Sequence, residues 1–480
     1  MKNPVQLPRG WLLLMAALLA GALSALALSG ALAAPRAGFL RMATNLSNSP
    51  NRYSYYADIA VSPDGDRVVV VWPEAYQDGG SAQKGSVYLR WASESTGSGW
   101  SAPVTVHAGG SNECARWAAV AITGTGPYTA HVAYIVQSPC NNPTQQFIRH
   151  RTCVLGAGCS DPQTVVNRSL GTNDTGLGSV DLALDDEGRP HFAYVDYQYV
   201  TGEGDVGTVY YRSPDGIVQQ VSGANDDALT PAIAWNGGKV HIVWATEPRQ
   251  NQWEYYIYYW QPGSTNALIK QGLSYAPHEP AIAVFSNTVM VVWEMNNADS
   301  DNNCSSDQTQ CTRYTLAYIR SVDNGSTWPL SGGTPQWYEL HRDGETFGTN
   351  WPYTSTGQVI EYTRFLRPSV GFRADGKPVV VWHVNDGTTD SPDYNIYYTE
   401  ALTVPESAAD PIEWSEIRRF GQNPPGNSAS PVVAPLLPTD ALHVVYLQGT
   451  GSDWETYYDG NEYDRYSRVY LPIVMRSFQW

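Results

Sequence analysis

The amino-acid sequence predicts an all-β protein, a seven-bladed β-propeller whose blades are four-stranded antiparallel sheets. Two observations lead to this prediction. A pair of apolar strands joined by a short, often glycine-containing turn, the second strand ending in Trp or Tyr, occurs seven times along the 480 residues. A third, Tyr-rich strand follows each pair, and no 3.6-residue periodicity appears beyond the N-terminal apolar segment. Sheets repeated in this way bury both faces against their neighbours and protect their edges when they close into a ring.

The aromatic residue that ends the second strand marks each repeat. The seven markers are Trp72, Tyr134, Tyr194, Trp244, Trp293, Trp382 and Tyr446. We expect the propeller to span residues 38–470, with a strand at residues 39–44 completing the seventh blade and residues 471–480 forming a short tail. The longest interval, between Trp293 and Trp382, contains an insertion at about residues 345–366 that we interpret as a lid or specificity loop, or as an ordinary surface excursion.

The N-terminus has the layout of a secretory signal peptide. Lys2 and Arg9 precede an apolar run at residues 11–28, and small residues follow up to Ala33. We therefore expect residues 1–33 to be cleaved and the mature protein to be secreted or held at the cell surface; an uncleaved anchor is the alternative. No later segment is long enough to cross a membrane as an apolar helix.

The charge balance limits the partners. With 46 acidic and 29 basic residues the net charge is −17, which disfavours nucleic acid as the main partner because phosphate binding needs a basic surface. Six cysteines in an exported chain favour disulfides over metal thiolates. Placing each cysteine on one of the two loop faces of the ring predicts three bridges: Cys114–Cys140, Cys153–Cys159 and Cys304–Cys311.

The loops after each second strand, and those that lead into each first strand, share one face of a propeller, here called the top face. They are long and variable, as binding loops on a rigid scaffold usually are. Carboxylates and aromatic rings occur together in them, a combination that suits sugars, although solvated loop charge is the alternative. The ligand-binding candidates are Glu74, Glu113, Trp117, Trp253, Glu279, Trp351 and Tyr353.

One top-face loop contains half of a calcium-binding motif. Its oxygen ligands occupy positions 1, 3, 5 and 9 of a twelve-residue loop: Asp299, Asp301, Asn303 and Asp307. Cys304 stands in place of the turn glycine, and Gln310 stands in place of the bidentate glutamate. Calcium is the single cofactor that the sequence indicates.

A turn after the third strand of the fifth repeat carries a recognisable motif. Ser321, Asp323, Gly325 and Trp328 fit the pattern Ser-x-Asp-x-Gly-x-Thr-Trp. The strand repeat described above covers nearly all of residues 38–470. With this repeat and the turn motif, the chain resembles the sialidase-like Asp-box (BNR repeat) β-propellers. Chemically the motif is a turn device, because a short carboxylate accepts backbone amides and glycine tolerates a positive φ.

The resemblance implies a carbohydrate substrate and three arginines that clamp its carboxylate, beside a Tyr/Glu nucleophile pair and an Asp acid/base. Arg367, directly before Pro368, is an approximate counterpart of one clamp residue, and Arg116 enters the first strand of the second repeat similarly. With Glu294 these arginines are the candidate catalytic residues. The histidines of the second strands share one repeat position and fit packing rather than catalysis: His131, His191, His241 and His443.

These observations favour a secreted, sialidase-like propeller that binds an extracellular glycan or protein through an acidic, aromatic top face. The alternatives are an exo-acting glycoside hydrolase of sialidase type and a structural envelope or matrix protein. The sequence leaves open whether the protein is an enzyme.

Overall fold

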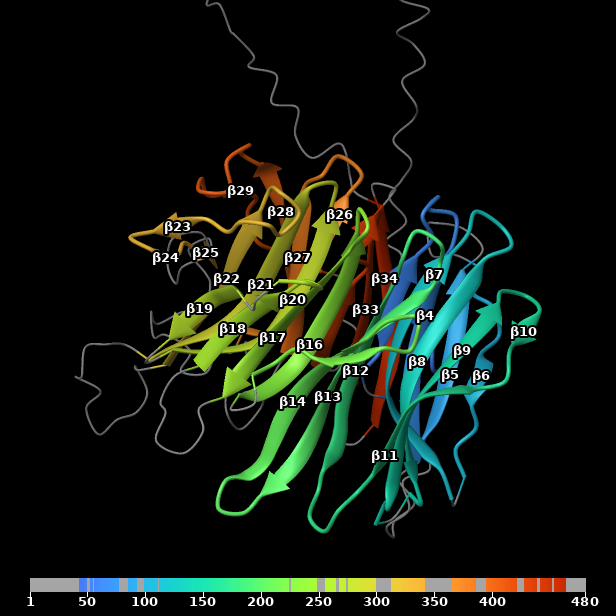
Figure 1. Cartoon of the computed structure of the whole chain (residues 1–480). Coiled ribbons are helices and arrows are strands. Elements are labelled where there is room, and N and C mark those ends of the chain that lie inside the picture. The colour runs from blue at the N-terminus through green and yellow to red at the C-terminus, as the bar shows by residue number, and fades with distance from the viewer. Residues whose placement is uncertain are drawn as a thin grey trace, which may run out of the picture. The chain divides into compact units, whose positions relative to one another are not determined.

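The structure is a computed structural model that describes residues 43–462 except 50–51, 55, 77–84, 93–98, 111, 141, 224–225, 248–254, 265–266, 273–274, 299–311, 342–364, 386–393, 421–426, 438–440 and 451–452. The predicted signal peptide, the 471–480 tail and most of the insertion at residues 345–366 lie outside this part of the chain. Within it, seven antiparallel sheets follow one another in chain order and form a propeller ring, and no segment is helical (Figure 1). The predicted fold class is confirmed.

Each blade is numbered by its order in the chain. Blade 1 contains β2 (Arg52–Ser54), β3 (Asp58–Val61), β4 (Val68–Tyr76), β5 (Ser86–Ala92) and β6 (Val104–His107). Blade 2 contains β7 (Cys114–Thr123), β8 (Thr129–Ser138), β9 (Gln145–Val154), β10 (Gly158–Cys159) and β11 (Gln163–Ser169). Blade 3 contains β12 (Gly176–Leu184), β13 (Pro190–Val200), β14 (Gly204–Arg212) and β15 (Val218–Gln220).

Blade 4 contains β16 (Asp227–Asn236), β17 (Lys239–Glu247), β18 (Tyr255–Trp260) and β19 (Ala267–Gly272). Blade 5 contains β20 (Tyr275–Phe285), β21 (Thr288–Ala298), β22 (Thr312–Ser321) and β25 (Tyr338–His341), with a separate hairpin of β23 (Leu330–Ser331) and β24 (Thr334–Pro335). Blade 6 contains β26 (Phe365–Arg373), β27 (Pro378–Asn385), β28 (Tyr394–Thr403), β29 (Glu413–Trp414) and β30 (Arg418–Arg419). Blade 7 contains β31 (Asn427–Val433), β33 (Ala441–Thr450), β34 (Asp453–Glu462) and β1 (Thr44–Asn45), while β32 (Leu436–Leu437) pairs with β26.

An N-terminal strand closes the ring, as predicted. β1 pairs antiparallel with β34, with Thr44 opposite Tyr458 and Asn45 opposite Tyr457. The next residue, Leu46, is fully buried and donates its backbone N–H to the carbonyl oxygen of Thr456 at 2.8 Å. Figure 1 shows the red strands β33 and β34 beside the blue strands of blade 1. The predicted strand at residues 39–44 is seen only at its last residue, because residues 39–42 lie outside the described part of the chain.

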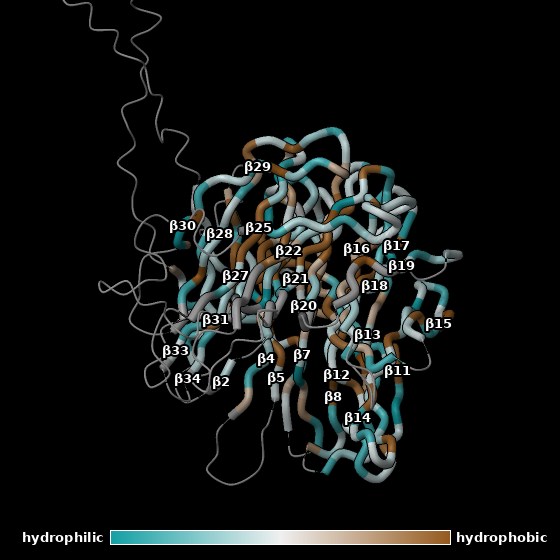
Figure 2. Tube along the Cα trace, turned by 90° about the vertical axis from the view of Figure 1, so that its left-hand side faces the viewer, coloured by the Kyte–Doolittle hydropathy of each residue, from teal (hydrophilic) through white to brown (hydrophobic). Residues whose placement is uncertain are grey.

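The core lies between the blades. Six apolar clusters each combine side chains of neighbouring blades, and Figure 2 shows hydrophobic colour mainly along the strands. Because both faces of each sheet are covered, the strands carry continuous apolar runs instead of alternating ones. Five marker aromatics have an exposed fraction of 1% or less: Trp72, Tyr134, Trp244, Trp293 and Trp382.

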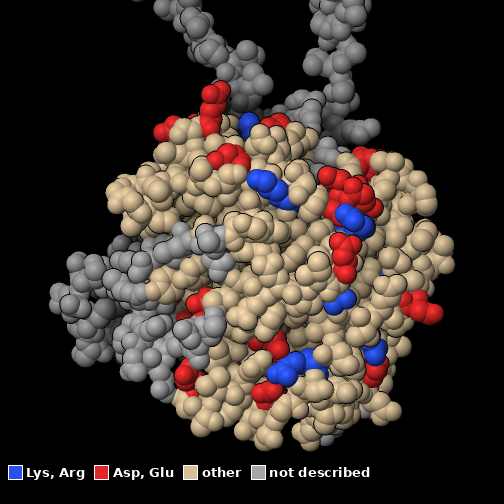
Figure 3. Space-filling view, in the orientation of Figure 1, with Lys and Arg blue, Asp and Glu red and all other residues tan. Residues whose placement is uncertain are grey.

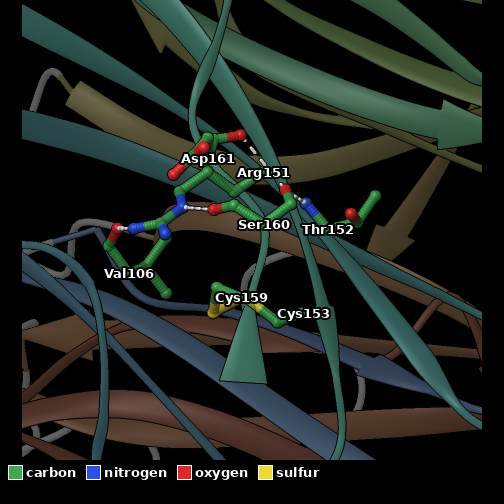
Figure 4. Close-up of a disulfide and its surroundings, with 7 residues drawn as sticks. All are labelled: Val106, Arg151, Thr152, Cys153, Cys159, Ser160 and Asp161. Carbon is green, nitrogen blue, oxygen red and sulfur yellow. Dashed lines mark hydrogen bonds between the residues drawn. A yellow bond between two sulfur atoms is a disulfide. The ribbon is translucent and has the colours of Figure 1, made fainter. Parts of the chain in front are cut away.

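Two predicted disulfides are present, Cys114–Cys140 and Cys153–Cys159. The second closes the hairpin between β9 and β10 (Figure 4). Beside it, Arg151 donates hydrogen bonds to the carbonyl oxygens of Ser160 in the same blade and Val106 in blade 1. This arginine therefore joins two blades. Cys304 and Cys311 lie outside the described residues.

The turn at Ser321–Trp328 is held by its own side chains. Asp323 accepts the backbone N–H of Thr327 at 2.8 Å and the Ser321 hydroxyl group at 2.7 Å. Gly325 has a φ of 75° and donates its N–H to the Ser321 hydroxyl group at 3.0 Å. Trp328 packs edge-on against Tyr259 of blade 4, so the turn also contributes to the contact between blades 4 and 5.

Candidate functional site

A cavity of about 280 Å³ lies at the centre of the ring. The innermost strands of all seven blades contribute to its wall. Its size is near the lower end of the range of about 300–1,000 Å³ that is usual for small-molecule sites. On the face drawn in Figure 3, the acidic and basic side chains of the described residues are few and interspersed, without a large patch of a single sign among them.

One backbone feature recurs around the cavity. In six blades a non-glycine residue has a φ between 40° and 54° at an interruption of the innermost strand's pairing, which in blade 1 is the break between β2 and β3. These residues are Tyr56, Trp117, Thr230, Glu279, Arg367 and Ser430, and all six line the cavity. In blade 3 the interruption falls at Gly178 instead. Bulges of this kind re-aim side chains, and the left-handed conformation costs roughly 1–2 kcal/mol per residue.

Two of these residues form an aromatic platform, Tyr56 and Trp117. Their ring centroids are 4.2 Å apart and their planes are inclined by 30°. The guanidinium carbon of Arg367 lies 5.1 Å from the Tyr56 ring centroid, within cation–π distance. Blades 1, 2 and 6 thus contribute to a single stacked group on the cavity wall.

Arg367 also forms polar contacts with two neighbouring blades. Its Nε atom lies 3.0 Å from Oε2 of Glu279, and its Nη1 atom donates to the Ser430 hydroxyl oxygen at 3.0 Å. Burial disfavours the charged guanidinium, but the Glu279 carboxylate and Tyr56 outweigh it, so the pKa of Arg367 is raised. The side chains of Arg367 and Glu279 remain about one-third exposed, 35% and 34%, and are therefore accessible to a ligand.

Two aspartates occupy the same repeat position in blades 1 and 3 and also line the cavity. Asp58 accepts the backbone N–H of Val120 in blade 2 at 2.7 Å, and Asp181 accepts that of Ile233 in blade 4 at 2.9 Å. Burial, together with the charge of Asp181, raises the pKa of Asp58 to about 7. Burial raises the pKa of Asp181 to about 6. Each carboxylate therefore links neighbouring blades and adds a titratable group to the cavity wall.

The structure brings together three of the residues predicted from sequence, Trp117, Glu279 and Arg367. The other described candidates do not line the cavity. The Glu74 carboxylate accepts hydrogen bonds from the Trp72 indole at 2.9 Å and the Ser49 hydroxyl group at 2.7 Å. Glu113 forms a two-pronged ion pair with Arg149, with both distances 2.7 Å.

Arg116 donates to the carbonyl oxygen of Leu177 at 2.7 Å and so joins blade 2 to blade 3. Glu294 is 2% exposed, within the sheet of blade 5. Several remaining candidates lie outside the described residues: Trp253, Trp351, Tyr353, Asp299, Asp301, Asn303 and Asp307. Within the described ranges, no three His, Cys, Asp or Glu side chains are grouped to hold a metal ion, and no helix could span a membrane.

Among the cavity-wall residues that sequence reasoning did not single out, five bear on the chemistry of the site: Tyr56, Asp58, Asp181, Thr230 and Ser430. A signal was available at two of them. Thr230 and Ser430 directly precede a proline at the start of an innermost strand, as Glu279 and Arg367 do. Aligning these four repeats on that proline would have placed all four residues at one position of the ring.

No protein-family model and no curated protein matches the chain. Among solved structures, a Trypanosoma rangeli sialidase in complex with sialic acid is 11% identical, with a TM-score of 0.41, over 85% of this chain and 54% of that one. The NanB sialidase of Streptococcus pneumoniae is 12% identical, with a TM-score of 0.42, over 88% and 70% of the two chains. An intramolecular trans-sialidase from Ruminococcus gnavus is 9% identical, with a TM-score of 0.43, over 86% and 95%. The chain thus spans about half the length of the T. rangeli sialidase, with 54% of that chain covered.

Proposed function

We propose that the protein is an exported β-propeller that binds an extracellular glycan in its central cavity. The observation that carries this proposal is the aromatic platform of Tyr56 and Trp117 beside the hydrogen-bonding groups of Arg367, Glu279 and Ser430. A sugar ring offers an apolar face that stacks on aromatic side chains and hydroxyl groups that hydrogen-bond at its rim. The signal-peptide pattern at residues 1–33 supports export.

The composition of the wall favours binding over sialidase-type hydrolysis. Among the described residues that line the cavity, Arg367 is the single arginine, and it already contacts Glu279, Ser430 and Tyr56. A three-arginine clamp for a substrate carboxylate is not assembled from this part of the chain.

The test is a glycan array on the purified mature protein, followed by calorimetric titration of the glycans that bind. Trp117→Ala removes half of the platform and is expected to weaken binding by roughly tenfold or more, since a stacked aromatic contributes about 0.5–1.5 kcal/mol beyond its buried area. Trp235→Ala is the matched control, because Trp235 stacks on His191 and does not line the cavity. Absence of any glycan binding, or equal losses in both variants, would refute the proposal.

Hydrolysis is the second candidate function. It is favoured by Asp58, a carboxyl group on the cavity wall whose pKa is raised to about 7, because a general acid must hold its proton near neutral pH. A panel of fluorogenic glycosides measures this activity directly. Turnover that disappears in Asp58→Asn while glycan binding persists would assign hydrolysis to the cavity.

A further inference from the structure

We infer that the central cavity selects a sugar that carries a protonated amine, with Asp58 and Asp181 as its counter-charges. This inference rests on the proposed glycan-binding function and adds to it the charge of the ligand.

The charged side chains of the described cavity wall are predominantly acidic. They are Asp58, Asp181, Glu279 and Arg367, which gives three carboxylates and one guanidinium. A ligand in the cavity is surrounded by protein on several sides, where charge interactions are stronger than in bulk water. A carboxylate-bearing sugar would meet like charges here, whereas an ammonium group would meet opposite charges.

Among the described residues of the wall, the single cation is engaged within the protein. Arg367 pairs with Glu279 at 3.0 Å, donates to Ser430 and lies against the Tyr56 ring. These contacts neutralise its charge and hold it against the aromatic platform. We therefore infer that Arg367 positions Tyr56. Once Arg367 and Glu279 are paired, Asp58 and Asp181 are the remaining carboxyl groups of the described wall.

Asp58 and Asp181 are not required by the strand to which they belong. The same repeat position is occupied by Ala119, Ala232 and Ala281 in blades 2, 4 and 5. Three blades thus pack here without a carboxylate. Each aspartate accepts the backbone N–H of a residue in the next blade and that of the residue that follows it, Ile59 or Leu182, and these contacts order the side chain. Burial raises the pKa of both carboxyl groups, and an ammonium group bound beside them would lower the pKa again and favour the charged form.

The experiment compares two ligands that differ at one group, an oligosaccharide of glucosamine and its fully N-acetylated counterpart. Calorimetric titration at pH 7 with the mature protein gives the ratio of the two dissociation constants. The amine form is expected to bind on the order of tenfold more tightly, as one desolvated charge interaction of about 1.4 kcal/mol implies.

Asp58→Ala and Asp181→Ala introduce the alanine that blades 2, 4 and 5 carry at this position, and the double variant is expected to reduce this ratio to near one. Because the acetyl group adds bulk as well as removing charge, the change in the ratio between variants, not the ratio itself, reports the counter-charges. Asp161→Ala is the control: Asp161 is exposed and outside the cavity wall, and the substitution removes one carboxyl group, as each single cavity substitution does. A thermal unfolding curve for each variant verifies that the ring is folded.

Equal or tighter binding of the N-acetylated sugar by the wild-type protein overturns the inference and leaves glycan binding intact. An amine preference that survives in the folded double variant also overturns it. If neither sugar nor any glycan of the array binds, the proposed function itself fails. A preference that is lost in the double variant and kept in Asp161→Ala supports the inference.

Discussion

Six left-handed residues surround the cavity, and none of them is a glycine. In L-residues this conformation brings Cβ close to the following carbonyl oxygen, so each such residue opposes folding by roughly 1–2 kcal/mol. Strained backbone persists only where surrounding structure holds it in place, and it is concentrated at functional sites. Here it occurs in six of the seven blades, and each of these residues lines the cavity.

Thr230 is the position at which this strain should be easiest to measure. It has a φ of 40° and a β-branched side chain, for which the left-handed region is least favourable. Thr230→Gly is expected to stabilise the protein by about 0.5–1 kcal/mol. This value is the strain energy that glycine relieves in the folded state minus the free energy that its extra flexibility contributes to the unfolded state. The measurement is the midpoint of urea unfolding. Thr230→Ala keeps Cβ and serves as the control; a glycine variant less stable than both would show that the bulge is not strained.

At the scale of the strand, buried histidines join the second and third strands of three blades. His191, His241 and His443 each share a hydrogen bond of 2.6–2.7 Å with a tyrosine hydroxyl group, on Tyr211, Tyr259 and Tyr458. Burial lowers the pKa of His241 and of His443 to about 4. Their position within the blades supports the interpretation of the repeated histidines as packing residues.

Because these histidines are buried in their neutral form, we expect the protein to lose stability in mild acid. Histidine in an unfolded chain has a pKa near 6.5, so the unfolded state binds protons first as the pH falls. The contribution of the buried histidines to the free energy of unfolding is therefore complete above pH 6.5, and it decreases as the pH falls from 6.5 to 4. Asp58 and Asp181 act in the opposite sense, because their raised pKa values make folding more favourable as the pH falls below 7. The pKa is lowered to about 4 for five histidines, including His107, His131 and His150, so we expect net destabilisation.

Urea unfolding at pH 7, 6 and 5 measures this dependence. In His443→Gln the group no longer titrates, so the variant should lose less stability between pH 7 and 5 than the wild-type protein, by up to about 2 kcal/mol. Parallel pH profiles for the two proteins would contradict the assignment of acid sensitivity to the buried histidines.

At the scale of the whole molecule, ring closure depends on a few residues beside the first strand. Leu46 is fully buried, and its carbonyl oxygen accepts a hydrogen bond from Arg90 of blade 1 at 2.9 Å. Ser47 accepts the backbone N–H of Thr456 at 2.9 Å through its hydroxyl oxygen. The two ends of the described chain are thus joined by both packing and hydrogen bonds.

Leu46→Ala is expected to destabilise the protein by about 2–5 kcal/mol, because it leaves a cavity at the point where the ring closes. The measurement is the free energy of unfolding in urea. Leu330→Ala, at a side chain that is 61% exposed, is the matched control and should change stability by less than about 0.5 kcal/mol. Similar effects of the two substitutions would show that closure contributes little to stability.

Much of the fold could be predicted from the sequence, because its signals are local and repeated. The marker aromatics from Trp72 to Tyr446 identified seven blades. A sheet buried on both faces needs a continuous apolar strand, and in every repeat this strand ends in Trp or Tyr. The same repeats assigned Cys114 and Cys140 to one face, and the structure joins them.

The candidate site was only partly predictable. Trp117, Glu279 and Arg367 were recognised by residue type, but their neighbours Tyr56, Ser430 and the two aspartates were not. Residue type does not specify a left-handed φ in Thr, Glu or Arg, and it does not specify which blades meet. The sequence by itself determined the repeating sheet, its count and its buried faces, because each blade's apolar pattern is read within one repeat. Only the tertiary structure decided which side chains share the cavity, because closure of the ring brings together residues as far apart as Tyr56 and Ser430.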